Sequence, residues 1–183
     1  MDWMNQLGAV LQQYNGAGAA PATVQDDFDQ VTQGAPQSAL SDGIAAAFRS
    51  DQTPDFGQMA GQLFANSSGQ QRAGILNTLI KAAGPMILSQ ILSRRANSSG
   101  GGGLSSLIDL LGGGQQTQVT PEQAEQIPVE AVQEMADQAE KKDPSIIDQV
   151  SGFYAEHPTL VKTLGAAALT IALAKIAQRQ QAG

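Results

Sequence analysis

Histidine is the side chain best suited to proton transfer near neutral pH, and the chain has one, His157. A two-histidine metal site is therefore excluded within one chain, and the adjacent Glu156 is poorly placed to ligate the same ion. His157 directly precedes Pro158, and proline favours the first position of a helix. We therefore expect His157 to be a helix N-cap or turn residue rather than a catalytic base.

Three carboxylates, those of Glu130, Glu134 and Asp137, share one face of a helix expected at 129–141. Acid–base catalysis by paired carboxylates needs one acid in an apolar pocket, where its pKa rises. Nothing in the sequence isolates one of these acids from the other two. We therefore expect a solvated acidic stripe with no catalytic function.

Other patterns that carry chemistry are missing from the sequence. The chain has no cysteine, which excludes disulfides, thiolate nucleophiles and thiolate metal ligands. Its glycine runs lack the Gly-Lys-Ser/Thr ending of a phosphate-binding loop, and no strand is predicted before them. No serine stands in a nucleophile elbow. We therefore predict a protein with no enzyme active site, no cofactor and no metal.

Charge and composition limit the partners that the chain can bind. The 183 residues include 10 basic and 17 acidic side chains, and the resulting net charge of −7 repels phosphate backbones. We expect no nucleic-acid partner, and we predict that the adjacent Arg94 and Arg95 belong to the last turn of a helix. Only 15% of the residues are charged, whereas 42% are hydrophobic. Such a weakly charged surface favours self-association.

Apolar residues recur at helical spacing along most of the chain, and no segment shows the alternation typical of a strand. We predict an all-α, multi-helix bundle with Gly/Ser-rich linkers and essentially no sheet. Thr120 and Gln123 match a capping box, and the segments 75–80 and 86–92 are expected at the centre of an N-terminal core, hinged at Gly84-Pro85. The predicted helices lie at 3–14, 24–31, 40–48, 56–64, 75–80, 86–92, 121–127, 129–141, 145–155 and 159–179.

A stretch rich in glycine and serine divides the chain and encloses an apolar island at 104–111. We predict an N-terminal helical region at 1–97, a glycine-rich linker with a short apolar helix at 98–118, and a C-terminal helical unit at 119–183. A helix of two turns is not stable alone in water. The island is therefore expected to dock on the rest of the molecule, on another copy or on another partner.

The predicted helix at 159–179 is apolar on nearly all sides, which is typical of a helix that is buried or lies in lipid. Its uncharged stretch, 163–174, would span roughly 18 Å, less than the roughly 30 Å of a bilayer's hydrocarbon core. Small residues in the middle of one face would let a neighbouring helix approach closely. We favour a central place in the chain's own bundle over self-association between chains and over membrane contact. The face consists of Val161, Gly165, Ala168, Ala172 and Ile176.

Two stretches resemble a known family. The segment Gly103-Leu104-Ser105-Ser106-Leu107-Ile108-Asp109-Leu110-Leu111-Gly112-Gly113-Gly114, followed by Val119-Thr120-Pro121-Glu122-Gln123, is similar to the YidB-like family of small bacterial proteins. The opening Met-x-x-Met-x-x-Leu-Gly-x-Val-Leu is faintly similar to the same family. This resemblance implies a bacterial, helical, cytoplasmic protein without assigned catalysis. It supplies no functional residue, since none is established for the family.

These patterns favour a non-enzymatic structural or interaction protein that self-associates through apolar helices. The expected partner is another copy of the chain, and the second option is another protein. The alternative is a peripheral membrane-associated protein that uses the final helix, with Lys162, Lys175 and Arg179, as a reversible anchor. The first residues do not read as a secretory signal, so the expected location is cytoplasmic. The predicted contact residues are Leu104, Leu107, Ile108, Leu111, Val161, Leu164, Gly165, Ala168, Ala172 and Ile176.

Overall fold

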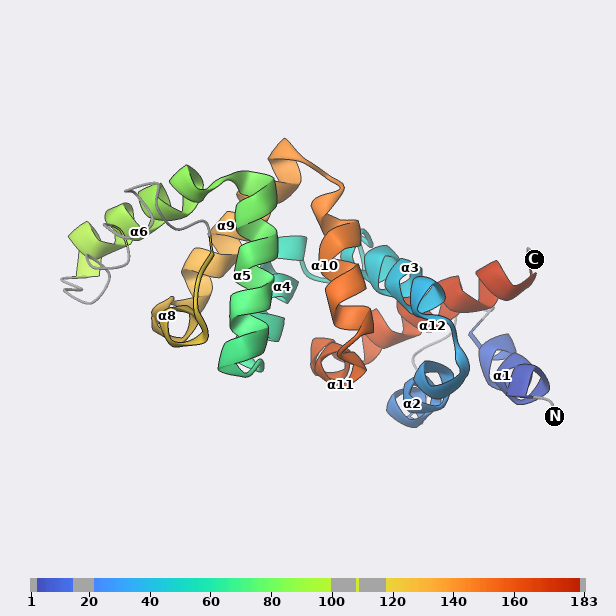
Figure 1. Cartoon of the computed structure of the whole chain (residues 1–183). Coiled ribbons are helices and arrows are strands. Elements are labelled where there is room, and N and C mark those ends of the chain that lie inside the picture. Colours follow the sequence, from blue (N-terminus) through green and yellow to red (C-terminus); the bar gives the residue numbers. More distant parts are fainter. Residues whose placement is uncertain (1–2, 15–21, 100–107, 109–117, 182–183) are drawn as a thin grey trace. The chain divides into compact units, whose positions relative to one another are not determined.

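The computed structural model describes residues 3–14, 22–99, 108 and 118–181 (Figure 1). These residues form 11 α-helices and no strand, which confirms the predicted all-α fold. The helices are α1 Trp3–Gln12, α2 Val24–Gly34, α3 Gln37–Phe48, α4 Phe56–Ala65, α5 Gly69–Ala83, α6 Pro85–Ser99, α8 Pro121–Gln126, α9 Val129–Lys142, α10 Ile146–Ala155, α11 Pro158–Val161 and α12 Ala166–Gln181, with a 3-10 turn, η1, at Lys162–Leu164.

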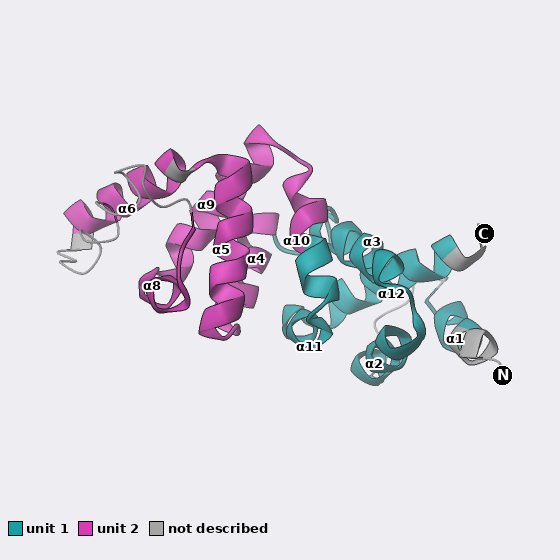
Figure 2. Ribbon diagram, viewed as in Figure 1, with its two compact units in different colours: residues 1–55, 151–183 teal, residues 56–150 magenta. Residues whose placement is uncertain are grey.

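The helices form two compact units, coloured separately in Figure 2. Unit 1 consists of residues 1–55 and 151–183, and unit 2 consists of residues 56–150. This division differs from the ranges expected from the sequence, because helices from the two ends of the chain pack together in unit 1. The glycine-rich stretch falls between α6 and α8, two helices of the same unit, so it does not separate the units.

Unit 1 is built around the pair α3 and α12, which lie side by side, with α1 and α2 also packed on α12 (Figure 1). The two backbones of the central pair come close at Gly43. A Cβ atom at this position would lie 2.7 Å from the carbonyl oxygen of Ala172, closer than real Cβ contacts, and 2.9 Å from Cγ1 of Ile176. A glycine is therefore needed here for packing, since any larger residue would push α3 and α12 apart.

Unit 2 is built around α4 and α9, with α5 packed on α8 and α9. Gly57 and Gly61 stand one turn apart on α4, and a Cβ at Gly57 would lie 2.7 Å from the backbone oxygen of Gln133 on α9. The apolar side chains predicted for α5 are buried, but most of the packing partners of α5 follow residue 118 in the sequence. The expected N-terminal core is therefore wrong, because α5 completes a core that α8 and α9 share.

Two glycines with positive φ stop helices where the chain must turn. Gly84 has a φ of 96°, and the chain bends by 111° between α5 and α6, which confirms the predicted hinge at Gly84-Pro85. Gly165 has a φ of 91° and ends η1. The single helix predicted at 159–179 is therefore wrong, because α11, η1 and α12 replace it. Only glycine adopts such a φ at low cost, so the break occurs at this residue.

Candidate functional site

The face predicted for contacts on the final helix lies inside unit 1. Gly165, at the break before α12, is partly exposed. Further along α12, Ala172 and Ile176 lie close to Gly43 of α3 in the same chain. These residues therefore do not form a free surface in this conformation. The exposed fractions of the remaining predicted residues are 1% for Val161, 9% for Leu164, 1% for Ala168, 0% for Ala172 and 1% for Ile176.

The second predicted contact segment is the apolar island. Leu104, Leu107 and Leu111 lie outside the described residues. Ile108 is described, and it is helical and partly exposed. The docking of this segment on another copy stays a prediction.

His157 occupies the N-cap position of α11, as predicted, although its side chain makes no capping hydrogen bond. Its ring packs against the ring of Phe153, with 4.9 Å between the ring centroids. The neighbouring Glu156 accepts a hydrogen bond of 3.1 Å from the side-chain amide of Gln37. His157 thus contributes to packing within unit 1, and Glu156 makes an exposed polar contact there.

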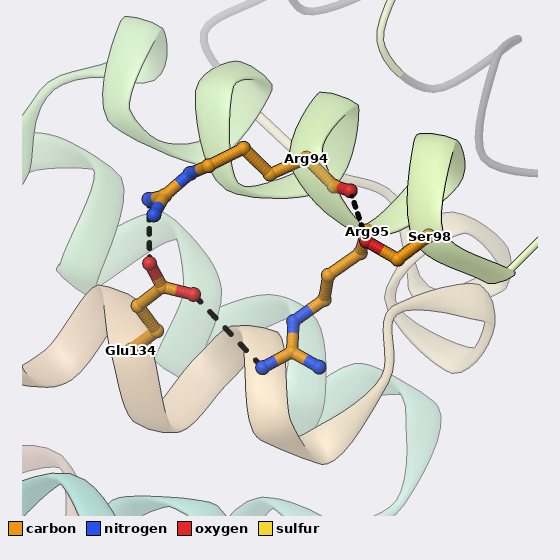
Figure 3. Close-up of polar contacts among 4 residues, drawn as sticks. All are labelled: Arg94, Arg95, Ser98 and Glu134. Atoms are coloured by element: carbon orange, nitrogen blue, oxygen red, sulfur yellow. Dashed lines mark hydrogen bonds and ion pairs between the residues drawn. The ribbon is translucent and has the colours of Figure 1, made fainter.

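Glu134 of α9 forms ion pairs with two arginines of α6 (Figure 3). Its Oε1 accepts a 2.5 Å hydrogen bond from Arg94, and its Oε2 lies 3.9 Å from Nη2 of Arg95. The expected solvated stripe is wrong for Glu134, and the arginines precede the last turn of α6 rather than forming it. The sequence carried no signal for this contact, because the partners come from two helices that are distant in the chain. The ion pairs tie α6 to α9.

Asp137 also departs from the expected stripe, because it is only partly exposed and its carboxyl group faces the backbone of Gly57. The missing Cβ of the glycine leaves the space that the aspartate side chain fills. Glu130 is exposed, as predicted. The acidic stripe of α9 is therefore used mainly for contacts with α4 and α6.

A buried carboxylate at the start of α2 accepts several hydrogen bonds that the sequence does not predict. Asp27, 6% exposed, accepts three hydrogen bonds on Oδ2. They come from the hydroxyl of Tyr14 at 2.6 Å, the hydroxyl of Thr23 at 3.0 Å and the amide of Gln13 at 3.3 Å. Burial, followed by the bond to Asp27, raises the pKa of Tyr14 far above its ordinary value. The group joins the end of α1 to the start of α2.

Two hydroxyls on α10 are buried without a hydrogen-bond partner among the described residues, those of Ser151 and Tyr154. The ring of Tyr154 stands edge-on to Phe48 and Phe153, with centroids 6.4 and 5.4 Å away. Burial raises the pKa of the Tyr154 hydroxyl well above its usual value, so the group is neutral. Tyr154 is therefore a large core side chain of unit 1.

Within the described part of the chain, no three histidine, aspartate or glutamate side chains come close enough to hold a metal ion. No single described helix is long and apolar enough to cross a membrane. Among the described residues, one pair of successive helices, α5 and α6, reaches that length and apolar composition only when both are taken together, and the pair is bent by 111°.

Comparison of the chain with protein-family models, curated proteins and solved structures gave no match. The resemblance to the YidB-like family consequently stays a prediction from the sequence.

Proposed function

We propose that this chain is a non-enzymatic structural or interaction protein that associates with copies of itself. The observation that carries the proposal is the use of its polar side chains. Asp27 and Glu134 each accept bonds from neighbouring segments of the chain, and the only histidine packs against an aromatic ring. The groups best suited to chemistry thus serve helix packing. A cysteine-free, acidic composition is compatible with a cytoplasmic location.

For the self-contact, we propose the apolar island at 104–111 as the main segment. The inner face of α12 is already packed on α3, so it could contact another copy only after leaving unit 1. In the sequence, Leu104, Leu107, Ile108 and Leu111 recur at helical spacing between glycine runs. Two such segments from different copies could bury these side chains against each other, which satisfies the need of a short helix for a partner.

Light scattering across a concentration series tests this proposal with matched variants. The double substitution Leu107→Asp with Leu111→Asp places two charges on the apolar face, and it is expected to weaken association about a hundredfold or more. The expected mass is then that of the single 19.0 kDa chain over the range in which the unchanged protein associates.

The control is Ser105→Asp with Ser106→Asp, which adds the same two charges to the polar side of the same segment. It is expected to associate as the unchanged protein does. A single-chain mass for the unchanged protein at every concentration would contradict self-association. Equal weakening by both double variants would contradict the assignment of the contact to the apolar face.

The membrane alternative has less support, because two of the three basic groups expected to flank an anchor form ion pairs within unit 1. Nζ of Lys162 lies 2.6 Å from Oδ2 of Asp29, and Arg179 pairs with Asp42. The apolar side chains Leu169 and Leu173 of α12 are fully buried. An anchor of this kind would have to break these contacts before it could reach lipid.

A further inference from the structure

Helix α1 is attached to unit 1 at its C-terminal end. Of the side chains described there, Leu11 and Tyr14 are buried, with exposed fractions of 2% and 4%. Gly8, one turn earlier, has open space around it, because a Cβ at this position would meet nothing within 4 Å. Unlike Gly43 of α3, Gly8 is therefore not a point of close backbone approach to a neighbouring helix.

At this end of α1, three side-chain hydrogen bonds share one acceptor, the carboxylate of Asp27. Tyr14 and Gln13, which follow α1 directly, both donate to Oδ2 of Asp27, and Thr23 donates to the same oxygen from the residue before α2. A hydrogen bond from a buried hydroxyl to a carboxylate is among the stronger kinds. Without Asp27, the Tyr14 hydroxyl would be left buried with no acceptor, which is costly.

The other helices of unit 1 are held together by contacts that do not involve Asp27. Helices α3 and α12 are packed closely at Gly43. Lys162 ties the turn before α12 to Asp29 of α2, and Arg179 ties α12 to Asp42 of α3. The loss of α1 would therefore leave these two ion pairs and the close backbone approach at Gly43 intact.

We propose that α1 is a separable strap, fastened to α2 by the carboxylate of Asp27, that can leave unit 1 while α2, α3 and α12 stay folded. The strap goes beyond the proposed function, since its opening requires no second copy of the chain. Unit 1 would then have two parts: a closely packed set formed by α2, α3 and α12, and the helix α1, whose C-terminal end is joined to α2 by the polar cluster at Asp27.

Hydrogen exchange of the full-length chain, followed by mass spectrometry, tests the strap. In Asp27→Ala, the amides of α1 are expected to exchange at least about tenfold faster than in the unchanged protein, because the local opening of α1 becomes easier. The amides of α3 and α12 are expected to stay within about threefold of their original rates. Asp26→Ala is the matched control, since Asp26 is an exposed acid in the same turn of α2, and it is expected to leave all of these rates unchanged.

Two results would overturn the proposal. Unchanged exchange of α1 in Asp27→Ala would show that the carboxylate does not fasten the helix. Equal acceleration of α1, α3 and α12 would show that α1 opens only with the whole unit. Should Asp27→Ala fail to fold, Tyr14→Phe keeps the ring and removes only the hydroxyl, and the same selective acceleration of α1 is required of it.

Discussion

Ala172→Glu is expected to lower the free energy of unfolding of unit 1 by about 4 kcal/mol or more, a large part of the 5–15 kcal/mol typical of whole proteins. Ala172 is fully buried, and its carbonyl oxygen faces Gly43, where α12 and α3 approach each other closely. A glutamate here would bury a carboxyl group with no room for its side chain. Urea unfolding followed by circular dichroism measures the effect.

Ala167→Glu is the matched control for this substitution, because Ala167 is exposed on the same helix. It introduces the same side chain and is expected to change the free energy of unfolding by no more than about 0.5 kcal/mol. Similar, small effects of both substitutions would mean that the Ala172 face of α12 is not buried inside unit 1.

Gly43→Ala is expected to lower the free energy of unfolding by about 2 kcal/mol. The added methyl group would collide with the backbone of Ala172 and with the side chain of Ile176, so α3 and α12 would have to move apart. This cost exceeds the gain of about 1 kcal/mol that alanine normally brings to the interior of a helix. Urea unfolding of the variant and of the unchanged protein gives the difference.

Gly8→Ala makes the same chemical change in α1, where the new methyl group would meet no neighbouring atom. It is expected to raise the free energy of unfolding by about 0.5–1 kcal/mol, as the higher helix propensity of alanine predicts. The two glycine-to-alanine substitutions are thus expected to change the free energy of unfolding in opposite directions. An increase in both variants would mean that the close approach at Gly43 is absent in solution.

The helices themselves could be predicted from the sequence because their signals are local. Apolar spacing and the prolines or glycines that begin or end a helix lie within a few residues of it. The structure confirms one such local signal, the capping box of Thr120 and Gln123 at the start of α8. Gly84 was recognised as a hinge because Pro85 follows it. Gly165 was not, because its surroundings continue the apolar pattern without a proline.

The pairing of helices could not be predicted, because it joins segments that are far apart in the chain. The small residues of α12 indicated that some helix approaches closely, but nothing local to them identified Gly43 of α3 as the contact. Gly57 of α4 likewise meets Gln133 of α9, on the other side of the glycine-rich stretch. The division into units follows from these pairings, so the ranges expected from composition differ from it.

The polar contacts were missed for the same reason. Asp27 reads in the sequence as one more acid near the start of α2, and its importance comes from Tyr14 and Gln13, which directly follow α1. Helical spacing predicts a solvated face for Glu134, because it carries no information on the two arginines that α6 supplies. A residue's role in such a cluster depends on partners that its own neighbourhood does not reveal.

The central claim is that the apolar closing helix, α12, is buried within its own chain. Hydrogen exchange of the unchanged protein at successive dilutions tests it most directly. Slow exchange of the α12 amides, at the level of α3 and independent of protein concentration, is the predicted result. Rapid exchange of α12 at every concentration, or protection that disappears on dilution, would contradict the claim, since the helix would then be exposed or buried only between copies.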